Sequence, residues 1–253
     1  MAFIELKRVT KRFGALIVLN ELSLDIEKGQ SLVVIGASGT GKSVMLKHIV
    51  GLLRPDHGEV WIEGRRIDKL PERDLVEVRT RFGFLFQMGA LFDSLTVAEN
   101  IGFPIVEHTH KPKDEIARIV ANKLRLVGLP EAGAKMPGEL SGGQKKRVAL
   151  ARAIALDPEV ILYDEPTTGL DPIRSDVINE LILKLQRELK VTSIVVTHDM
   201  NSAFKVADRI VMLHEGRIIF DGTPEDIQRS ENEHVQRFVQ GEAGETELAT
   251  LNL

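Results

Sequence analysis

One stretch restricts the fold of this chain more than any other: SLVVIGASGTGKS, residues 31–43. Its apolar run LVVI is typical of a strand that is covered on both faces of a sheet. The following GASGTGKS, Gly36 to Ser43, has two glycines separated by four residues and then Lys and Ser, which is the P-loop pattern. Apolar residues then recur at helical spacing until Pro55. A strand, this loop and a helix in that order predict a parallel sheet that binds phosphate, and they disfavour an ordinary glycine-rich turn.

The loop offers the groups that a nucleotide needs. Its backbone amides and the N-terminus of the following helix are expected to point at phosphate oxygens. Lys42 can reach the β- and γ-phosphates, and the Ser43 hydroxyl can ligate Mg²⁺. The predicted nucleotide-binding residues are therefore Gly36, Ser38, Gly39, Thr40, Gly41, Lys42, Ser43 and Val44.

Two adjacent carboxylates follow a second apolar run. VILYDEP places Asp164 and Glu165 at the end of a predicted buried strand, where Pro166 ends the pairing. Parallel sheets collect ligands at the carboxyl ends of their strands, which brings both acids beside the P-loop. We expect Asp164 to hold Mg²⁺ and Glu165 to orient and polarise the attacking water. The alternative, two solvated acids, fits poorly because four apolar residues come immediately before them.

Three further candidates depend on their context. His198 follows a third apolar strand, SIVVT, whose end is predicted at the same sheet edge, so it is a candidate γ-phosphate contact; alone it is typical of a surface histidine. Gln87, after RFGFLF, is a candidate for the catalytic set and for Mg²⁺, or an ordinary loop residue. Phe13 either stacks on adenine or packs in its own turn. Asp199 is expected to cap the next helix.

A second pair of glycines stands at the start of another helix, in ELSGGQKKRV. Ser141 and Gln144 have the spacing of a capping box, which explains two of the four residues. It does not explain Gly142 and Gly143, each of which costs up to about 1 kcal/mol relative to alanine near a helix. Such glycines let a phosphate approach the backbone. Because the P-loop already has its donors, the second loop is predicted to serve the nucleotide of another molecule.

The remaining sequence predicts one α/β domain of residues 1–240 and a polar tail of 241–253. FIELKRVTKRF and LNELSLDI indicate antiparallel strands, and a helical region spans about 88–158. RIVMLHEGRIIFDG indicates a hairpin about Glu215 and Gly216. The expected fold is a P-loop NTPase core with an antiparallel β subdomain and an inserted α-helical subdomain; the family resemblance given below implies that the core is RecA-like.

Composition excludes several classes of protein. No apolar run approaches the roughly 18 residues of a membrane span, and the N-terminus lacks the pattern of a signal peptide. The absence of cysteine excludes disulfides and thiolate metal sites and fits a reducing compartment. A net charge of -4 argues against nucleic acid as the main partner.

Taken together, these motifs resemble the nucleotide-binding subunit of an ATP-binding cassette (ABC) transporter along essentially the whole chain. Gln87 matches the Q-loop, LSGGQ the signature, YDEP the Walker B motif, Gly169-Leu170-Asp171 the D-loop and His198 the H-loop. The resemblance implies ATP and Mg²⁺ as cofactors. It also implies a head-to-tail dimer in which the signature of each subunit closes over the partner's ATP, with Asp171 at the interface.

The chain departs from the family pattern at two positions. Val44 stands where a hydroxyl residue commonly follows the P-loop serine, so one α-phosphate contact is expected to be missing. Gly169 stands where many cassettes have alanine, which leaves Asp171 in place in a more flexible loop.

A narrower resemblance comes from FQMGALFDSLTVAENIGFPIVEHT, residues 86–109, which is similar to the ATPases of Mla and Mce-associated lipid transporters. It implies phospholipid transport between inner and outer membrane, at the cytoplasmic face of a bacterial inner membrane. The implied partners are a permease dimer, a Mce-domain protein and a small STAS-like subunit. Within the segment, Leu91, Phe92 and Leu95 either contact the permease or pack inside the helical subdomain. A different transported substrate is the alternative, and a soluble ABC ATPase acting on nucleic acid is disfavoured because the chain carries one cassette without a long insertion.

Overall fold

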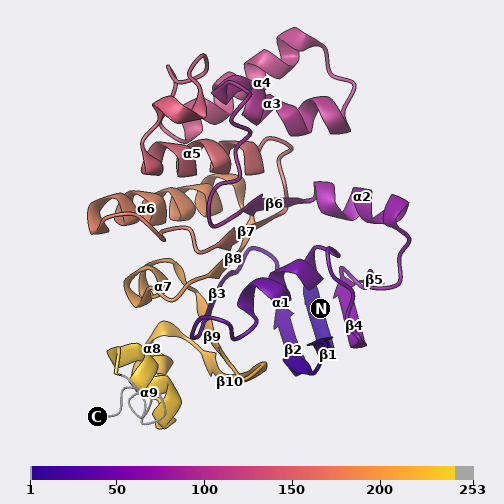
Figure 1. Cartoon of the computed structure of the whole chain (residues 1–253), viewed down its shortest axis with the longest axis vertical. Coiled ribbons are helices and arrows are strands. Elements are labelled where there is room, and N and C mark those ends of the chain that lie inside the picture. Colours follow the sequence, from indigo (N-terminus) through magenta and orange to yellow (C-terminus); the bar gives the residue numbers. More distant parts are fainter. Residues whose placement is uncertain (1, 243–253) are drawn as a thin grey trace.

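The structure is a computed structural model that describes residues 2–242. A six-stranded sheet forms its centre (Figure 1). The strands lie in the order β10 (Arg217–Gly222), β9 (Arg209–His214), β3 (Ser31–Ile35), β8 (Thr192–Val196), β7 (Val160–Asp164) and β6 (Phe82–Leu85). All neighbouring pairs are parallel except the hairpin of β9 and β10. The parallel sheet and the hairpin predicted from the sequence are therefore confirmed.

The central strand β3 shows why its apolar run is continuous. Leu32 and Val34 face a core that they share with the helix after the P-loop and with the N-terminal strands. Val33 and Ile35 face the opposite core, which the later helices cover. All four side chains are buried because both faces of the sheet are covered, as the sequence pattern predicts.

A second, antiparallel sheet is built mainly from the N-terminal part of the chain. Its order is β2 (Leu16–Ile26), β1 (Ile4–Phe13), β4 (His57–Ile62) and β5 (Arg65–Arg66). Leu22, Leu24 and Ile26 are buried while the residues between them are exposed, so the predicted alternation is confirmed. The sequence patterns located β1 and β2 and missed β4 and β5.

Helices cover both faces of the central sheet and form a separate group at one end of the molecule (Figure 1). That group is the inserted helical region predicted for 88–158, and it lies between β6 and β7 in the chain. Its members are α3 (Val97–His108), α4 (Lys113–Leu126), the short η1 (Pro137–Glu139) and α5 (Gly142–Ala153). The remaining helices are α1 (Lys42–Ile49), α2 (Glu72–Thr80), α6 (Pro172–Leu189), α7 (Met200–Val206), α8 (Pro224–Gln228) and α9 (Glu233–Gln240).

Within residues 2–242, none of the helices combines the length and the apolar character that a membrane span requires. The tail predicted for 241–253 falls, from residue 243 onward, outside the residues that the structure describes.

Candidate active site

The loops after β3, β7 and β8 meet at one edge of the central sheet. The register pairs Val34 with Val196 and Asp164 with Val196, so the three strands end side by side. A cavity of about 440 Å³ opens at this edge, with a lining that comprises Phe13, Val18, Ser38, Gly39, Gly41, Lys42, Ser43, Val44, Gln87, Glu165 and His198. Every lining residue except Val18 was predicted from the sequence. The fold therefore gathers residues from five separate segments, as the common sheet edge requires.

The P-loop glycines are required by the backbone of the loop itself. Gly36 has φ 147°, and a Cβ there would lie 2.3 Å from the carbonyl oxygen of Leu213. Gly41 has φ 102°, and a Cβ there would lie 2.8 Å from the carbonyl oxygen of Val18. Gly41 also occupies the N-cap of α1, where no side chain caps the first amides. This uncapped helix start leaves backbone donors free for an anion.

Lys42 is held inside the same loop. Its ammonium donates to the carbonyl oxygens of Gly36 at 2.7 Å and Ala37 at 2.9 Å, and the residue is only 7% exposed. Burial lowers the pKa of Lys42, while the nearby charges of Glu165 and Asp164 oppose that shift. Among residues 2–242 no carboxylate forms an ion pair with it. The ammonium thus lacks a counter-ion, which a bound phosphate would supply.

Ser43 and Asp164 offer oxygen ligands of the kind that Mg²⁺ prefers. The Ser43 hydroxyl donates to Oδ1 of Asp164 at 3.0 Å. Burial raises the pKa of Asp164, and the hydrogen bond from Ser43 works in the opposite direction. Residues 2–242 contain no cluster of three or more His, Cys, Asp or Glu side chains suited to a metal. This donor set fits Mg²⁺, which takes one or two protein ligands and completes its shell with phosphate oxygens and water.

Glu165 has a strained backbone and a well-supported carboxylate. Its φ is 51°, the left-handed region, and its amide donates to the Val196 carbonyl at 2.9 Å. One carboxylate oxygen lies 2.9 Å from Nδ1 of His198 and accepts a hydrogen bond from the Thr168 hydroxyl at 3.2 Å. Strain of this type costs about 1–3 kcal/mol and persists where neighbouring groups fix it. The contact between Glu165 and His198 was not predicted, although both residues were expected at the same edge.

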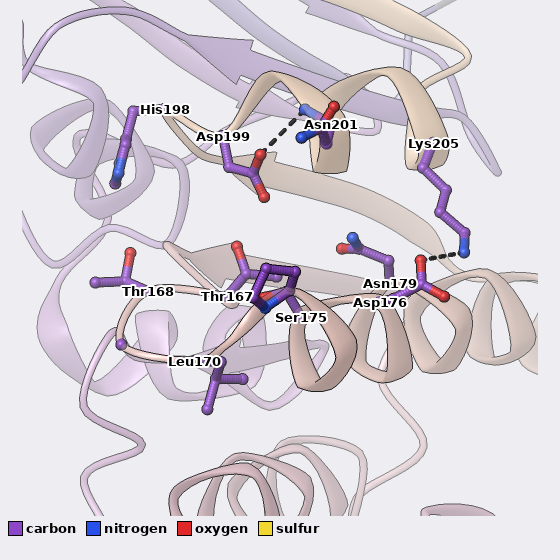
Figure 2. Close-up of a pocket in the computed structure, with 12 residues that line it drawn as sticks. Thr167, Thr168, Leu170, Ser175, Asp176, Asn179, His198, Asp199, Asn201 and Lys205 are labelled. Carbon is purple, nitrogen blue, oxygen red and sulfur yellow. Dashed lines mark hydrogen bonds and ion pairs between the residues drawn. The ribbon is translucent and has the colours of Figure 1, made fainter.

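His198 also borders a second cavity of about 490 Å³, which Figure 2 shows between the loop after β7 and the start of α7. Asp199 caps α7 by accepting from the Asn201 amide at 3.0 Å, as predicted. Its other oxygen accepts from the Ser202 hydroxyl at 2.6 Å, and that hydroxyl accepts from Nδ2 of Asn179 at 2.8 Å. These hydrogen bonds, of which the one between Asn179 and Ser202 is buried, fix the loop that carries His198, and the sequence patterns did not reveal them.

The predicted interface residue Asp171 lies in the same region. Its side chain accepts from the Arg174 amide at 2.9 Å and so caps α6, while remaining exposed. Its local contacts explain the helix start, and its exposure leaves the carboxylate accessible to another molecule.

The signature loop differs from the P-loop in its helix cap and in the space around its glycines. The Gln144 amide donates to the Ser141 hydroxyl, and the Ser141 amide donates to Oε1 of Gln144 at 2.9 Å, so the predicted capping box is present. A Cβ on Gly142 would meet Leu170 at 3.7 Å, and one on Gly143 would meet Arg174 at the same distance, both ordinary contacts. The chain's own packing therefore does not require these glycines. None of the five residues of LSGGQ lines the cavity at the P-loop.

Phe13 stands at the mouth of that cavity and is 48% exposed. Its neighbours Leu16 and Ile17 are exposed as well, and the Lys11 ammonium lies 5.7 Å from the centre of the ring. Packing within its own turn thus leaves half of the side chain uncovered. An exposed aromatic surface of this kind suits a flat ring such as adenine.

The sequence pattern of the ABC transporter family matches residues 19–168. The ATP-binding protein MlaF of the intermembrane phospholipid transport system of Haemophilus influenzae is 45% identical over 95% of this chain and 91% of that protein. The probable ribonucleotide transport ATP-binding protein mkl of Mycobacterium leprae is 44% identical over 94% of this chain and 69% of that protein. A dimeric post-hydrolysis state of the ATP-binding cassette MJ0796, bound to ADP and Pi, has a TM-score of 0.80 and 35% identity, covering 87% of this chain and 98% of that one.

The family match, these two relatives and the P-loop fold with its antiparallel and helical subdomains agree with one another. They confirm the predicted fold class, the predicted enzyme activity and both cofactors. This chain belongs to the ABC transporter family and is an ATP-binding subunit that hydrolyses ATP with Mg²⁺ to drive transport.

Proposed function

We propose the following roles at the ATP site. Residues 36–44 bind the phosphates, with Lys42 replacing its two carbonyl partners by phosphate oxygens. Ser43 and Asp164, together with Gln87, hold Mg²⁺, which when bound neutralises charge on the phosphates. The juxtaposed Ser43 hydroxyl and Asp164 carboxylate are the observation that supports this assignment.

We assign the water-activating role to Glu165. Its carboxylate accepts a hydrogen bond from the attacking water, orients it and polarises it. His198 supports that carboxylate at 2.9 Å and lies in the same cavity, where it contacts the γ-phosphate. Phe13 provides the platform for adenine. Residues 1–240 act as one catalytic domain.

The signature loop acts across a dimer. Gly142 and Gly143 are not needed by the chain's own packing, and the loop lies outside the cavity of its own P-loop. A second copy in head-to-tail orientation would place Ser141 and the adjacent amides against its partner's ATP, with Asp171 at the interface. The related cassette MJ0796 is dimeric in its ADP-bound and Pi-bound state.

The permease docks on an aromatic cavity between the central sheet and the helical region. This cavity of about 620 Å³ is lined mainly by apolar and aromatic groups, which include Phe82, Phe84, Phe86, Phe92, Phe103 and Pro104. Phe92 is exposed and its ring centre lies 4.9 Å from that of Phe103, whereas Leu91 packs against the core. Exposed apolar surface with a polar rim commonly marks a protein contact. Phe92 is therefore assigned to the permease and Leu91 to internal packing.

We infer that the transported substrate is a phospholipid. Likeness to MlaF along 91% of that protein supports this choice, and the segment 86–109 resembles lipid-transport ATPases. The likeness to mkl supports ribonucleotide transport as a second candidate, over 69% of that protein. A lipid role would place the subunit at the cytoplasmic face of a bacterial inner membrane, with a permease dimer, a Mce-domain protein and a STAS-like subunit as partners.

The test is purification of the intact complex in a mild detergent through a tag on this chain. We expect a permease, a Mce-domain protein and phospholipid to copurify, and ATP hydrolysis in vesicles to depend on phospholipid transfer. Hydrolysis that responds to ribonucleotides, with no lipid carried by the complex, would instead support the second candidate.

A further inference from the structure

Lys146 is a buried cation that the proposed roles leave unexplained. It lies on α5, two residues after the last residue of the signature loop, and only 7% of the residue is exposed. Its ammonium donates to the backbone carbonyl of Gln87 and to that of Glu165, the latter at 3.2 Å. Within residues 2–242 it forms no ion pair with a carboxylate. A charged group that is buried with carbonyl partners alone is costly, so its position calls for a reason.

The carbonyl of Glu165 belongs to the strained residue of the site. With φ at 51°, the direction of the Glu165 side chain depends on what fixes its peptide groups. The amide side is held by Val196, and the carbonyl side is held by Lys146 and more weakly by the Thr168 amide at 3.3 Å. A charge-assisted hydrogen bond is roughly twice as strong as a neutral one. Lys146 is thus the strongest of the partners that hold the Glu165 carbonyl.

The carbonyl of Gln87 belongs to the loop that leads from the ATP cavity to the aromatic cavity. The next residues of this loop are held from the same helix. Arg152 of α5 donates to the backbone carbonyls of Gly89 at 2.9 Å and Ala90 at 2.8 Å. The Arg152 guanidinium also lies 5.8 Å from the ring centre of Phe92. Helix α5 therefore holds three carbonyls of this loop through two cations, and of these two cations Lys146 also donates to the Glu165 carbonyl.

We propose that Lys146 is a positioning residue for ATP hydrolysis, one that fixes Gln87 and Glu165 to the helix that begins at the signature loop. Closure of the signature loop on a partner's ATP displaces α5, and Lys146 transmits that displacement to both carbonyls. The alignment of the Glu165 carboxylate then depends on closure at the opposite ATP site. This inference rests on the roles proposed above for Gln87, Glu165 and the signature loop.

The adjacent Lys145 provides a matched control. It is on the same helix, is partly exposed, and its side chain makes no hydrogen bond or ion pair among residues 2–242. Lys146→Met and Lys145→Met remove the same charge and the same donors at neighbouring positions. Lys146→Gln keeps a donor, but it is neutral and its nitrogen reaches one atom less far.

The experiment measures steady-state ATP hydrolysis by the purified transporter complex, with kcat normalised to ATP-binding sites. We expect Lys146→Met to lower kcat about 10- to 100-fold, the usual cost of losing a group that orients a catalytic one, with KM for ATP within about twofold. Lys146→Gln should fall between Lys146→Met and the control, and Lys145→Met should match the unaltered complex. Should Lys146→Met fail to assemble, a normal kcat for Lys146→Gln overturns the proposal, and a reduced kcat at normal KM supports it.

Glu165→Gln, assayed in parallel, separates the two levels of inference. If Glu165→Gln is inactive while Lys146→Met matches Lys145→Met, only the positioning role is wrong. If Glu165→Gln hydrolyses ATP at a normal rate, the role proposed for Glu165 is wrong. A lower yield of Lys146→Met complex with an unchanged kcat per ATP-binding site would show that the residue serves stability alone, which also overturns the proposal.

Discussion

Helices α1 and α5 both begin at glycine-rich loops, but only the glycines before α1 are required by the backbone conformation of their loop. In the P-loop, Gly36 and Gly41 have left-handed φ values and stand so close to other backbone that a Cβ would clash. In the signature loop, Gly142 and Gly143 would accept a Cβ at ordinary distances. The helix after the P-loop has no side-chain cap, whereas α5 is capped by Ser141 and Gln144.

On the roles proposed above, the P-loop binds its ligand within one chain, whereas the signature loop needs a second molecule. Where the fold itself demands glycine and leaves helix amides uncapped, the ligand is expected in the cavity of the same chain. Where the fold does not require glycine and the helix already has a side-chain cap, as at Gly142 and Gly143, we expect the glycines to serve a ligand that approaches from outside the chain. Mutations can test each half of this statement separately.

The largest effect is expected from trapping the dimer. Glu165→Gln should retain ATP binding and lower kcat by about 10²- to 10⁴-fold, because an amide cannot act as a base for water. The trapped protein should dimerise with ATP, and adding Ser141→Arg should prevent this, as measured by light scattering. If the trapped protein binds ATP and stays monomeric with its permease present, the signature loop does not act in trans.

Lys42 and Ser141 should differ in which step they affect. Lys42→Ala removes the charge-assisted hydrogen bonds to phosphate, worth about 1.5–3 kcal/mol, so ATP affinity should fall about 10- to 100-fold. Ser141→Arg should leave the ATP affinity of the isolated subunit unchanged, because the signature loop does not line the cavity at its own P-loop. Titration with a fluorescent ATP analogue gives both values, and equal losses would remove the distinction between the two loops.

Phe13 extends the comparison, because its exposed aromatic ring stands at the mouth of the P-loop cavity. Stacking of a base on an aromatic ring contributes about 1–3 kcal/mol. Phe13→Ala should therefore raise KM for ATP and largely keep kcat at saturation. An unchanged KM would mean that the half-exposed ring serves only the turn between β1 and β2.

Gly36→Ala should show that the P-loop glycine is needed even without nucleotide. The new methyl group would meet the Leu213 carbonyl at 2.3 Å in a backbone region that alanine avoids. We expect the free energy of unfolding to fall by about 1–3 kcal/mol, which urea denaturation of the nucleotide-free protein measures. Unaltered stability would show that the loop relaxes freely, and the contrast with the signature loop would then disappear.

The sequence predicted most of this site because its signals are local. The P-loop glycines, the acids after an apolar run and the capping residues each have a short pattern with a physical cause. The common sheet edge then followed from three apolar strands that were expected to be parallel, which the register confirms. Strand β6 was missed, although RFGFLF contains it, because four residues are too few to establish the alternation of a strand.

What the sequence could not predict depends on tertiary contacts. Lys146 contacts carbonyls 59 and 19 residues away, and nothing in QKKRV distinguishes it from Lys145. The left-handed backbone of Glu165 is equally hidden, because glutamate has no preference for that region and only the packed site holds it there. The same applies to the hydrogen bonds that join Asn179, Ser202 and Asp199, because these residues come from two different helices and a loop.

The smallest predicted effect is an increase in the free energy of unfolding, opposite in sign to the effect expected of Gly36→Ala. Gly142 occupies the first turn of α5 with helical geometry and space for a methyl group 3.7 Å from Leu170. Gly142→Ala should therefore stabilise the isolated subunit, by about 0.4–1 kcal/mol, because alanine loses less backbone entropy on folding. The same methyl group would stand between the backbone and the partner's phosphate, so hydrolysis by the assembled transporter should fall while stability rises. Urea denaturation and steady-state hydrolysis of one preparation measure both quantities. A variant that is more stable and equally active would mean that no phosphate approaches Gly142, and the glycine would then need an explanation other than a second molecule.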